Sequence, residues 1–287
     1  MRVYCCPACH SENFNEFLRL DTERLARFID YSERFYGGLL STWLTDFDPI
    51  LMKCGSCSHV CYGVMPNFEQ LSEMYRSVRR SANAPDPARP PSLDMVKQME
   101  SLYSVVQSTA PTLLDFGAGY GRWSQAAFQS GFSVVSYEPH AMRSVQNGKY
   151  QVVHDRDQLD GCVFDVIWLE QVLEHVVDPL SILEDIRSFM SPTTMLCLSV
   201  PNIERCREGP DIWKLWPFDG VRSHTLAPFQ HLHGFSQRSL NALVYKAGLK
   251  RLQGLNIWRL DPTHQLRVAI GMSVPRLSTT RCYLTLR

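Results

Sequence analysis

The chain has 287 residues, 45% of them hydrophobic, and its 29 basic and 29 acidic side chains give a formal net charge of zero. That length suffices for one α/β domain and a small appendage, and the balanced charge gives no reason to expect a nucleic-acid backbone as partner. No apolar run reaches the length of a membrane span. The first ten residues, MRVYCCPACH, lack the apolar stretch of a signal peptide. We therefore expect a cytoplasmic protein without membrane contact.

Six of the ten cysteines lie within the first 61 residues and include two C-x-x-C pairs, Cys6 with Cys9 and Cys54 with Cys57. A turn inside each pair brings both sulfurs to one side, so the four thiolates can surround one tetrahedral ion. Paired C-x-x-C motifs favour a structural Zn²⁺ site over buried or redox-active thiols, and disulfides are not expected without secretion. The possible substitute ligands are Cys5, Cys61, His10 and His59.

The spacing between the two pairs predicts an insertion. Forty-four residues separate Cys9 from Cys54, which is long for a compact ribbon, so an inserted segment is expected at about 14–49. Residues 81–92, SANAPDPARPPS, contain four prolines and read as a linker. We therefore predict a zinc-ribbon-like region at 1–80, a linker at 81–92 and a second domain at 93–287.

The second domain alternates predicted helices and strands. Apolar side chains recur at helical spacing over 93–108, and Asp178-Pro179 is a good N-cap and N1 pair for a helix over 180–190. Gly131 and Gly248 indicate helix ends. Strands are predicted at 112–116, 132–137, 150–153, 164–169 and 195–200, with a terminal antiparallel pair beginning near 249–258. This alternation is typical of a parallel sheet with helices on both faces.

The strand at 112–116 runs directly into Gly117-Ala118-Gly119-Tyr120-Gly121. Closely spaced glycines let backbone N–H groups approach a ligand, because glycine has no Cβ. A dinucleotide fingerprint would need a third glycine where Arg122 stands, so the G-x-G-x-G spacing favours S-adenosylmethionine (SAM). The alternative is a plain strand-to-helix turn. With Asp115 near the strand end, the pattern resembles motif I of the class I SAM-dependent methyltransferases.

Later residues are similar to the same family. Glu138 follows the second strand, 19 residues after Gly119, where an acidic side chain can accept both ribose hydroxyls. Asp155 stands where the family holds the adenine amino group, and residues 164–179, FDVIWLEQVLEHVVDP, resemble its "FDvI…vLEHv.DP" stretch. The resemblance covers about 93–258 and implies a Rossmann-like sheet. It implies SAM binding by Asp115, Gly117, Ala118, Gly119, Glu138, Pro139, Asp155, Arg156, Leu169 and Glu170.

Residues 53–75, KCGSCSHVCYGVMPNFEQLSEMY, resemble the element that follows the zinc ribbon in methyltransferases of sugars and natural products. Members that methylate carbon carry a large extra C-terminal domain, and this sequence ends at Arg287, so we expect transfer to oxygen. An aromatic stretch between 202 and 230 suits a flat or sugar-like acceptor, or else packs as a lid. It contains Trp213, Trp216, Phe218 and Phe229, with Arg222 and His224 as candidate partners of an acidic group.

The methyl donor is already electrophilic, so a base is needed only if the acceptor carries its proton into the reaction. Candidates are His175, after the fourth strand, and His231 and His233, which share one side if their segment is extended. Residues 171–175 resemble the E-x-x-E-H element with which ubiquinone-pathway O-methyltransferases and small-RNA 3′-end methyltransferases bind a divalent ion. Gln171 replaces the first glutamate, and an amide is a poorer ligand for a hard cation.

We therefore favour a histidine base or pocket wall over a second divalent ion held by Glu174, His175 and His233. The predicted function is SAM-dependent O-methylation of a sugar or natural-product intermediate, with no nucleic-acid partner and with a homo-oligomer left open. The alternatives are N- or C-methylation, a SAM-binding protein without activity, and RNA methylation. Some rRNA methyltransferases carry an N-terminal zinc ribbon, and Arg79 and Arg80 keep that alternative open.

Overall fold

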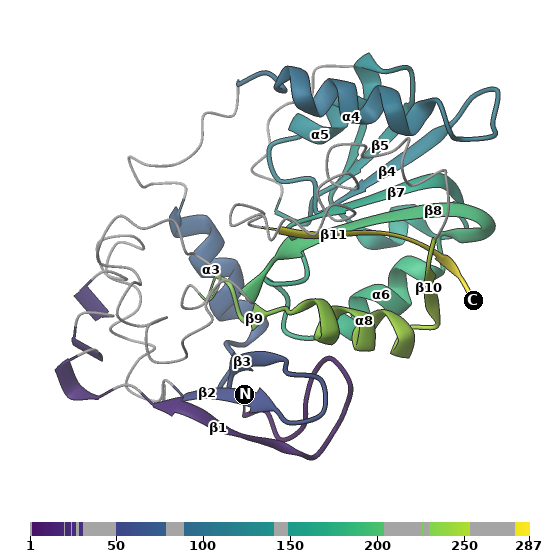
Figure 1. Ribbon diagram of the computed structural model, residues 1–287. Coiled ribbons are helices and arrows are strands. Elements are labelled where there is room, and N and C mark those ends of the chain that lie inside the picture. The colour runs from purple at the N-terminus through teal and green to yellow at the C-terminus, as the bar shows by residue number, and fades with distance from the viewer. Residues whose placement is uncertain are drawn as a thin grey trace.

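The computed structural model describes residues 2–19, 21–23, 25–26, 29–30, 50–78, 89–140, 149–203, 226, 230–252 and 279–287. These residues form a seven-stranded and a four-stranded sheet, which lie side by side in Figure 1. No helix among them is long and apolar enough to cross a lipid bilayer. Residues 81–88 of the predicted 81–92 linker and most of the expected insertion fall outside the described residues.

The large sheet has the strand order β10-β11-β8-β7-β4-β5-β6. Its strands are β4 (Thr112–Phe116), β5 (Ser133–Tyr137), β6 (Gln151–Val153), β7 (Phe164–Glu170), β8 (Met190–Pro201), β10 (Leu249–Arg251) and β11 (Thr279–Leu286). Neighbours from β6 to β8 pair in parallel, while β11 pairs antiparallel with β8 and β10. The predicted parallel sheet with a terminal antiparallel pair is confirmed. The strand order reverses beside β4, and ligands of such sheets bind at that point, outside the carboxyl ends of the strands.

Helices cover both faces of this sheet, as predicted. Helices α4 (Leu93–Tyr103) and α5 (Arg122–Gln129) lie on one face, and α6 (Pro179–Arg187) and α8 (Gln237–Lys246) on the other (Figure 1). The alternation of β4 divides the core accordingly: Leu113 packs with the α4–α5 cluster and Leu114 with the α6–α8 cluster. Both residues are fully buried.

Local signals set several helix ends. The Asp178 carboxylate accepts from the N–H groups of Leu180 and Ser181, which confirms the N-cap. Gly131 and Gly248 have φ angles of 101° and 70° after α5 and α8, so both end helices as predicted. Helix α4 ends at Tyr103, five residues before the expected end, with Ser104 as its C-cap. The Ser104 hydroxyl donates to the Ser101 carbonyl at 2.8 Å, as serines at helix ends commonly do.

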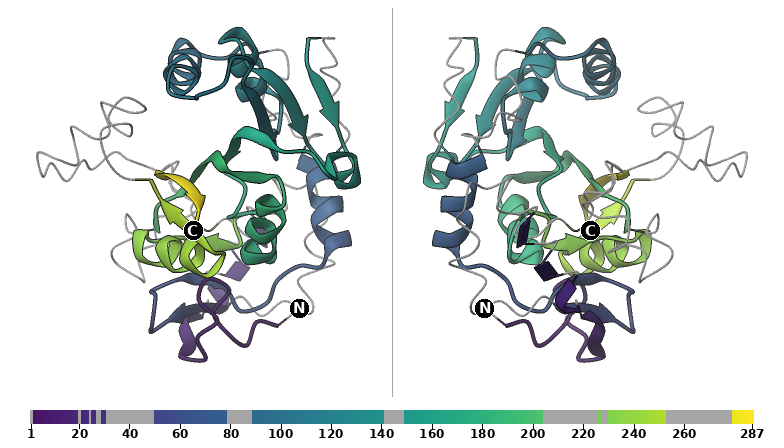
Figure 2. Two further views of the ribbon diagram at one scale, coloured as in Figure 1. Left: turned by 90° about the vertical axis from the view of Figure 1, so that its right-hand side faces the viewer. Right: turned by 90° about the vertical axis from the view of Figure 1, so that its left-hand side faces the viewer.

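The small sheet has the order β1-β2-β3-β9 and is antiparallel throughout. It is formed by β1 (Phe14–Arg19), β2 (Ile50–Cys54), β3 (Val60–Tyr62) and β9 (His233–Gly234). Since β1 pairs with β2, the insertion begins after Arg19 and not at Phe14. We call residues 2–19 and 50–62 the ribbon region. The strand β9, from far along the chain, completes the sheet of this region. Figure 2 shows the ribbon region beside α8 and distant from α4.

Candidate functional site

The glycine run after β4 has a backbone that other residues adopt only under strain. Gly117, Gly119 and Gly121 have φ angles of 73°, 51° and 69°. A Cβ on Gly117 would lie 2.6 Å from Cγ2 of Val172, so the loop passes directly against the residues that follow β7. The loop therefore lies at the strand-order reversal. The N–H groups of Gly117 and Ala118 donate to the Tyr137 carbonyl at 2.9 and 3.0 Å, so the end of β5 holds the loop in place.

Asp115 and Glu138 lie on the two sides of this loop. Asp115 is 2% exposed, and its carboxylate accepts a hydrogen bond of 2.5 Å from the Ser124 hydroxyl in the first turn of α5. Glu138 follows β5, and its carboxylate accepts from the N–H of Gly119 at 2.8 Å and from that of His140 at 3.1 Å. The predicted ribose-binding carboxylate is thus fixed beside the second glycine. Asp155 follows β6 and caps the short helix η1 (Arg156–Leu159).

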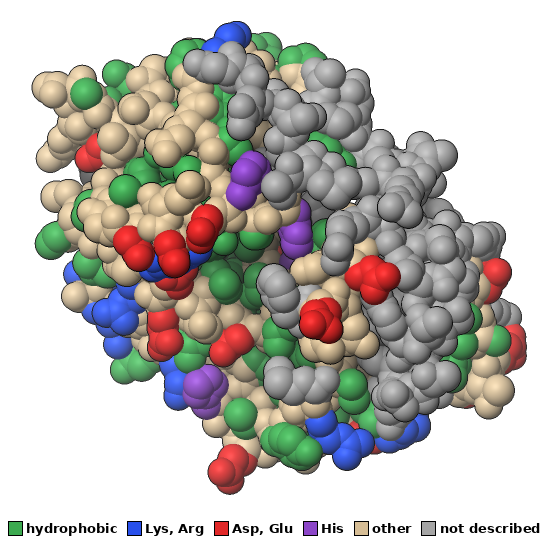
Figure 3. Space-filling view, turned by 180° about the vertical axis from the view of Figure 1, so that it is seen from behind, with side chains coloured by type: hydrophobic (Ala, Val, Ile, Leu, Met, Phe, Trp, Pro, Cys, Tyr) green, Lys and Arg blue, Asp and Glu red, His purple; other side chains and the backbone are tan. Residues whose placement is uncertain are grey.

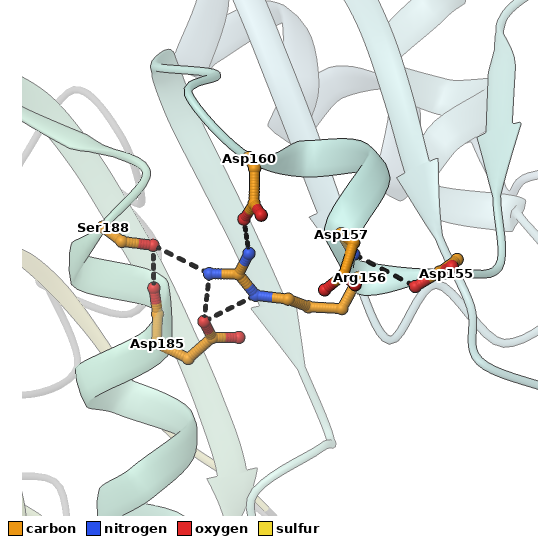
Figure 4. A network of polar contacts seen from close by, with 6 residues as sticks. All are labelled: Asp155, Arg156, Asp157, Asp160, Asp185 and Ser188. Atoms are coloured by element: carbon orange, nitrogen blue, oxygen red, sulfur yellow. Dashed lines mark hydrogen bonds and ion pairs between the residues drawn. The ribbon is translucent and has the colours of Figure 1, made fainter.

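The Arg156 side chain does not face the glycine loop. Its guanidinium donates to Asp185 of α6 at 2.8 Å, to the Ser188 hydroxyl at 3.2 Å and to Asp160 (Figure 4). Asp185 raises the pKa of Arg156. Arg156 is one of the residues expected to bind the cofactor, and its guanidinium charge joins η1 to α6.

Glu170, at the end of β7, forms an ion pair that the sequence did not predict. Its carboxylate oxygens lie 3.2 and 3.0 Å from Nη2 of Arg281 on β11, 111 residues away. The Arg281 guanidinium also lies 5.3 Å from the ring centroid of Trp168. Leu169, between Glu170 and Trp168, is fully buried. The ion pair with Arg281 thus fixes the Glu170 side chain at the carboxyl end of β7, which limits the freedom of that side chain to contact a ligand.

The chain turns sharply after β7, over residues that we call the 171–176 turn. Gln171 has a φ of 56°, which is uncommon for a residue with a side chain, and its N–H donates to the Ser199 carbonyl at 2.9 Å. Nδ1 of His175 donates to the Gln230 carbonyl at 2.6 Å, which leaves Nε2 with the lone pair. Burial lowers the pKa of His175 to about 4, so the ring is neutral at pH 7.

Glu174 is fully buried, and neither of its carboxyl oxygens has a hydrogen-bond partner among the described residues. Burial raises its pKa well above the ordinary value. Nε2 of His175 lies 3.8 Å from Oε1 of Glu174, and the His231 ring meets the His175 ring edge-on at 4.6 Å. One ligand atom from each of these three residues lies within 4.8 Å of the others. The carboxyl and two imidazoles thus form one compact polar group.

His233 does not belong to this group, which corrects two expectations. It is fully buried, with Nε2 2.9 Å from the Val176 carbonyl and Nδ1 3.0 Å from Nε2 of His59. Both ring nitrogens are thus engaged, so His233 has no free nitrogen for a catalytic proton. His231 takes the place expected for His233 beside Glu174. The two histidines do not share a side because β9 begins only at His233, and strand alternation does not extend back to His231.

Sequence reasoning missed Tyr75, in helix α3 (Phe68–Val78). Its ring lies 4.9 Å from the His140 ring and 6.2 Å from the His175 ring. Burial, together with the charges of Glu174 and Glu138, raises its pKa. Tyr75 thus lies between the cofactor side and the histidine side of the site. Tyr75 is the last residue of the 53–75 motif, and this position could have marked it as a candidate site residue.

The four cysteines expected to bind zinc come together. Their sulfurs lie within 4.8 Å of one another, with 3.5 Å between Cys6 and Cys57 and 3.6 Å between Cys9 and Cys54. A tetrahedral zinc with Zn–S bonds of about 2.3 Å separates its sulfurs by about 3.8 Å, whereas a disulfide needs about 2.05 Å. The sulfur spacing therefore fits a metal and not a disulfide.

The two knuckles have the same backbone. His10 and Ser58 each follow the second cysteine of a pair, with φ angles of 59° and 64°. Their N–H groups donate to the carbonyls of Cys6 and Cys54 at 2.7 and 2.9 Å. The hydrogen bond from Cys6 lowers the pKa of the Cys57 thiol to about 5, which favours a thiolate. Cys5 is exposed and outside the cluster, so the knuckle uses Cys6.

Several expected acceptor-side residues cannot be placed. Trp213, Trp216, Phe218, Phe229, Arg222 and His224 lie outside the described residues. The site as described therefore comprises the glycine loop with its two acidic neighbours, the 171–176 turn with His231, and Tyr75. A glycine loop at the reversal of this strand order, followed by an acidic residue after the next strand, is the arrangement with which open α/β sheets bind a nucleoside-containing cofactor.

Comparison with known proteins agrees with this class. The family model "Methyltransferase domain" matches residues 77–253, more than half of the chain. The chain therefore belongs to this methyltransferase family. A search of curated proteins found no match.

Solved structures share the fold at low sequence identity. The plantazolicin methyltransferase BamL, in complex with a triazolic desmethylPZN analog and SAH, is 12% identical with a TM-score of 0.51, covering 92% of this chain and 97% of that one. The mitomycin 7-O-methyltransferase MmcR is 16% identical with a TM-score of 0.44, covering 76% of this chain. This chain spans 57% of MmcR and 60% of an O-methyltransferase family protein from Burkholderia thailandensis.

Proposed function

We propose that this methyltransferase transfers a methyl group from SAM to an oxygen of a small molecule, such as a sugar or natural-product intermediate. The observation that carries the proposal is the close approach of the 171–176 turn to the glycine loop, where a Cβ on Gly117 would lie 2.6 Å from Val172. The same turn carries His175, which is neutral at pH 7. The natural-product acceptor rests on the resemblance of residues 53–75 to zinc-ribbon methyltransferases.

The cofactor side is proposed to bind SAM through backbone and carboxylate groups. The loop at Gly117, Ala118 and Gly119 would let the amino-acid part of the cofactor approach the backbone closely, because glycine has no Cβ, and Glu138 would accept the ribose hydroxyls. Asp155 would hold the adenine amino group, with Pro139 and Leu169 as apolar neighbours. SAM supplies an electrophilic methyl group, so these residues mainly fix its direction.

The acceptor side is proposed to remove a proton. Because the Gln230 carbonyl fixes the proton on Nδ1, His175 presents the lone pair of Nε2. That nitrogen would take the proton of an acceptor hydroxyl as the oxygen bonds to the methyl carbon, the carbon–sulfur bond of SAM breaks and S-adenosylhomocysteine leaves. Glu174 lies 3.8 Å away, and because burial raises its pKa, its carboxyl would stabilise the imidazolium only after losing its own proton. His231 lies edge-on to this ring and completes the wall.

The four-cysteine cluster is proposed to bind one structural Zn²⁺ through Cys6, Cys9, Cys54 and Cys57. The matching knuckle turns and the sulfur spacing support this. The metal would hold the first 19 residues against strand β2 and would take no part in methyl transfer. We keep the division into a ribbon-like region at 1–80, a linker at 81–92 and a methyltransferase domain at 93–287, in a cytoplasmic protein. A homo-oligomer remains open.

A second divalent ion at Glu174, His175 and His231 is the alternative to a plain histidine base. Its support is the buried Glu174 carboxyl without hydrogen bonds among the described residues. One carboxylate and two imidazoles suit a transition metal better than Mg²⁺. Turnover that falls on dialysis against a chelator while the Cys₄ zinc is retained, and recovers with added metal, would favour this alternative.

RNA is the main alternative acceptor, and N- or C-methylation or SAM binding without turnover remain as others. On the face drawn in Figure 3, acidic and basic side chains of the described residues are interspersed and form no continuous basic surface. That arrangement gives little attraction for a phosphate backbone.

The test is methyl transfer from radiolabelled SAM into an extract of source cells, separated by size with nuclease and protease controls. Label in the small-molecule fraction is expected, and mass spectrometry would then identify the methylated atom. Label in nuclease-sensitive large material would replace the small molecule by RNA. SAM binding without label in any fraction would indicate a protein that binds but does not transfer.

A further inference from the structure

We propose that the ribbon region positions the acceptor side of the active site, through His59 and His233 as positioning residues. This gives the ribbon a role in the proposed methyl transfer and rests on that proposed function. The contacts run from the second cysteine knuckle, across the interface between the two sheets, to the 171–176 turn.

The first contact ties His59 to the knuckle. His59 follows Cys57 by two residues, and its carbonyl accepts from the N–H of Cys54 at 2.8 Å. Both neighbours are expected metal ligands, so a bound ion fixes the backbone at His59. The His59 side chain is fully buried and packs on the Phe235 ring at 4.9 Å. Its place is therefore set by the ribbon on one side and by the methyltransferase region on the other.

The second contact is a hydrogen bond with a defined direction. Nε2 of His233 faces the Val176 carbonyl at 2.9 Å, so it must carry a proton. Nδ1 of His233 is then the acceptor, and Nε2 of His59 donates to it at 3.0 Å. Two buried imidazoles thus connect the knuckle to the last residue of the 171–176 turn.

A second connection between the ribbon region and the 171–176 turn is made by backbone hydrogen bonds. Cys61 of β3 pairs with His233 of β9, and the Tyr62 N–H donates to the Leu232 carbonyl at 3.2 Å. The Leu232 N–H in turn donates to the Glu174 carbonyl at 2.6 Å. The same strand that completes the ribbon sheet therefore holds the backbone of Glu174. Two residues earlier, the Gln230 carbonyl fixes the proton on His175.

The 171–176 turn needs such external support. It lies outside regular secondary structure, and Gln171 holds a left-handed conformation that is strained for a residue with a side chain. Glu174 is buried there without hydrogen bonds to its carboxyl among the described residues. A strained turn with a buried acidic group persists only when its surroundings fix it. Leu232 and His233 supply two of the fixing contacts, and the ribbon region holds both residues through Tyr62, Cys61 and His59.

The test follows the Nδ1 proton of His175 by NMR of ¹⁵N-histidine-labelled, zinc-loaded protein, assigned by its absence in His175→Gln. In His59→Leu, which cannot donate to His233, exchange of this proton with water is expected to accelerate at least about tenfold. His59→Gln keeps an N–H donor and is expected to restore slow exchange. His10→Asn, an exposed position beside the first knuckle, is the matched control and should behave as wild type.

Zinc content and SAM affinity are measured on the same samples. Zinc is expected to stay at one ion per chain, and SAM affinity to stay within about threefold of wild type. Unchanged His175 exchange in His59→Leu would overturn the proposal. If that variant does not fold, wild-type protein stripped of zinc by a chelator provides the second measurement, and slow exchange there would equally overturn it. Failure of the proposed function would show separately, as absence of methyl transfer by wild type.

Discussion

The two sides of the site are assembled in different ways. The cofactor side comes from consecutive elements of one parallel sheet, with the glycine loop after β4 and Glu138 after β5. The acceptor side joins three distant segments: Tyr75 from α3, the 171–176 turn and the residues around His231. The ribbon region contacts the last two of these through β9. The geometry of the cofactor side therefore depends on one sheet alone, whereas the geometry of the acceptor side depends also on the ribbon region.

The largest expected effect comes from breaking the ribbon. Cys54→Ser removes one thiolate, and a three-thiolate site should retain less than about a tenth of the zinc, with a clear fall in melting temperature. The measurement is zinc per chain by elemental analysis with a thermal unfolding scan. Cys5→Ser, an exposed neighbour of Cys6, is the control and should change neither value. Retention of full zinc by Cys54→Ser would remove this cysteine from the ligand set.

The second effect concerns the pH dependence of stability on the acceptor side. His175 has a folded pKa of about 4, below the ordinary 6.5, so the unfolded chain binds its proton more readily. Stability is therefore fully present above pH 6.5 and is lost as the pH falls toward 4, by about 3 kcal/mol at most. His175→Gln should show a shallower slope of unfolding free energy in this window, measured by urea titration.

Burial also lowers the folded pKa of His233 to about 4. The contribution of His233 to the pH dependence of the unfolding free energy should therefore remain in His175→Gln. A slope identical to wild type in His175→Gln would mean that His175 is not buried neutral.

The third effect tests the cofactor side alone. In Gly117→Ala the new Cβ would lie 2.6 Å from Val172, which should weaken SAM binding about 30-fold, or about 2 kcal/mol. Gly161→Ala is the matched control, because Gly161 has the same φ of 73° but nothing within 4 Å of a Cβ. It should lose stability without losing SAM affinity. Equal affinities of both variants, measured by calorimetry, would show that the contact with Val172 is irrelevant to the cofactor.

The smallest effect removes one charge beside the glycine loop. Glu138→Gln keeps the shape and an acceptor for the Gly119 N–H but weakens hydrogen bonds to the ribose hydroxyls. SAM affinity should fall about tenfold, or about 1.4 kcal/mol. Glu184→Gln, an exposed residue of α6, removes the same charge elsewhere and should leave affinity unchanged. An unchanged affinity of Glu138→Gln would contradict the ribose role.

The difference between the two sides also decided what could be predicted from sequence. The strands, the Asp178 cap and the glycine loop follow from local patterns, and the two knuckles follow from cysteine spacing. Contacts over long sequence separations were missed, such as Glu170 with Arg281 and the inclusion of β9 in the ribbon sheet. The sequence predicted His233 as the histidine beside Glu174, but His231 lies there. The prediction assumed strand alternation from His231 onward, whereas β9 begins only at His233.

The most direct test of the central claim is calorimetric titration of SAM into the wild-type protein. The glycine loop, Asp115 and Glu138 predict one SAM per chain, with a dissociation constant of roughly 1–100 μM and displacement by S-adenosylhomocysteine. No binding heat with either compound, from protein whose zinc content and thermal unfolding are intact, would contradict the claim that this fold carries a working methyltransferase site.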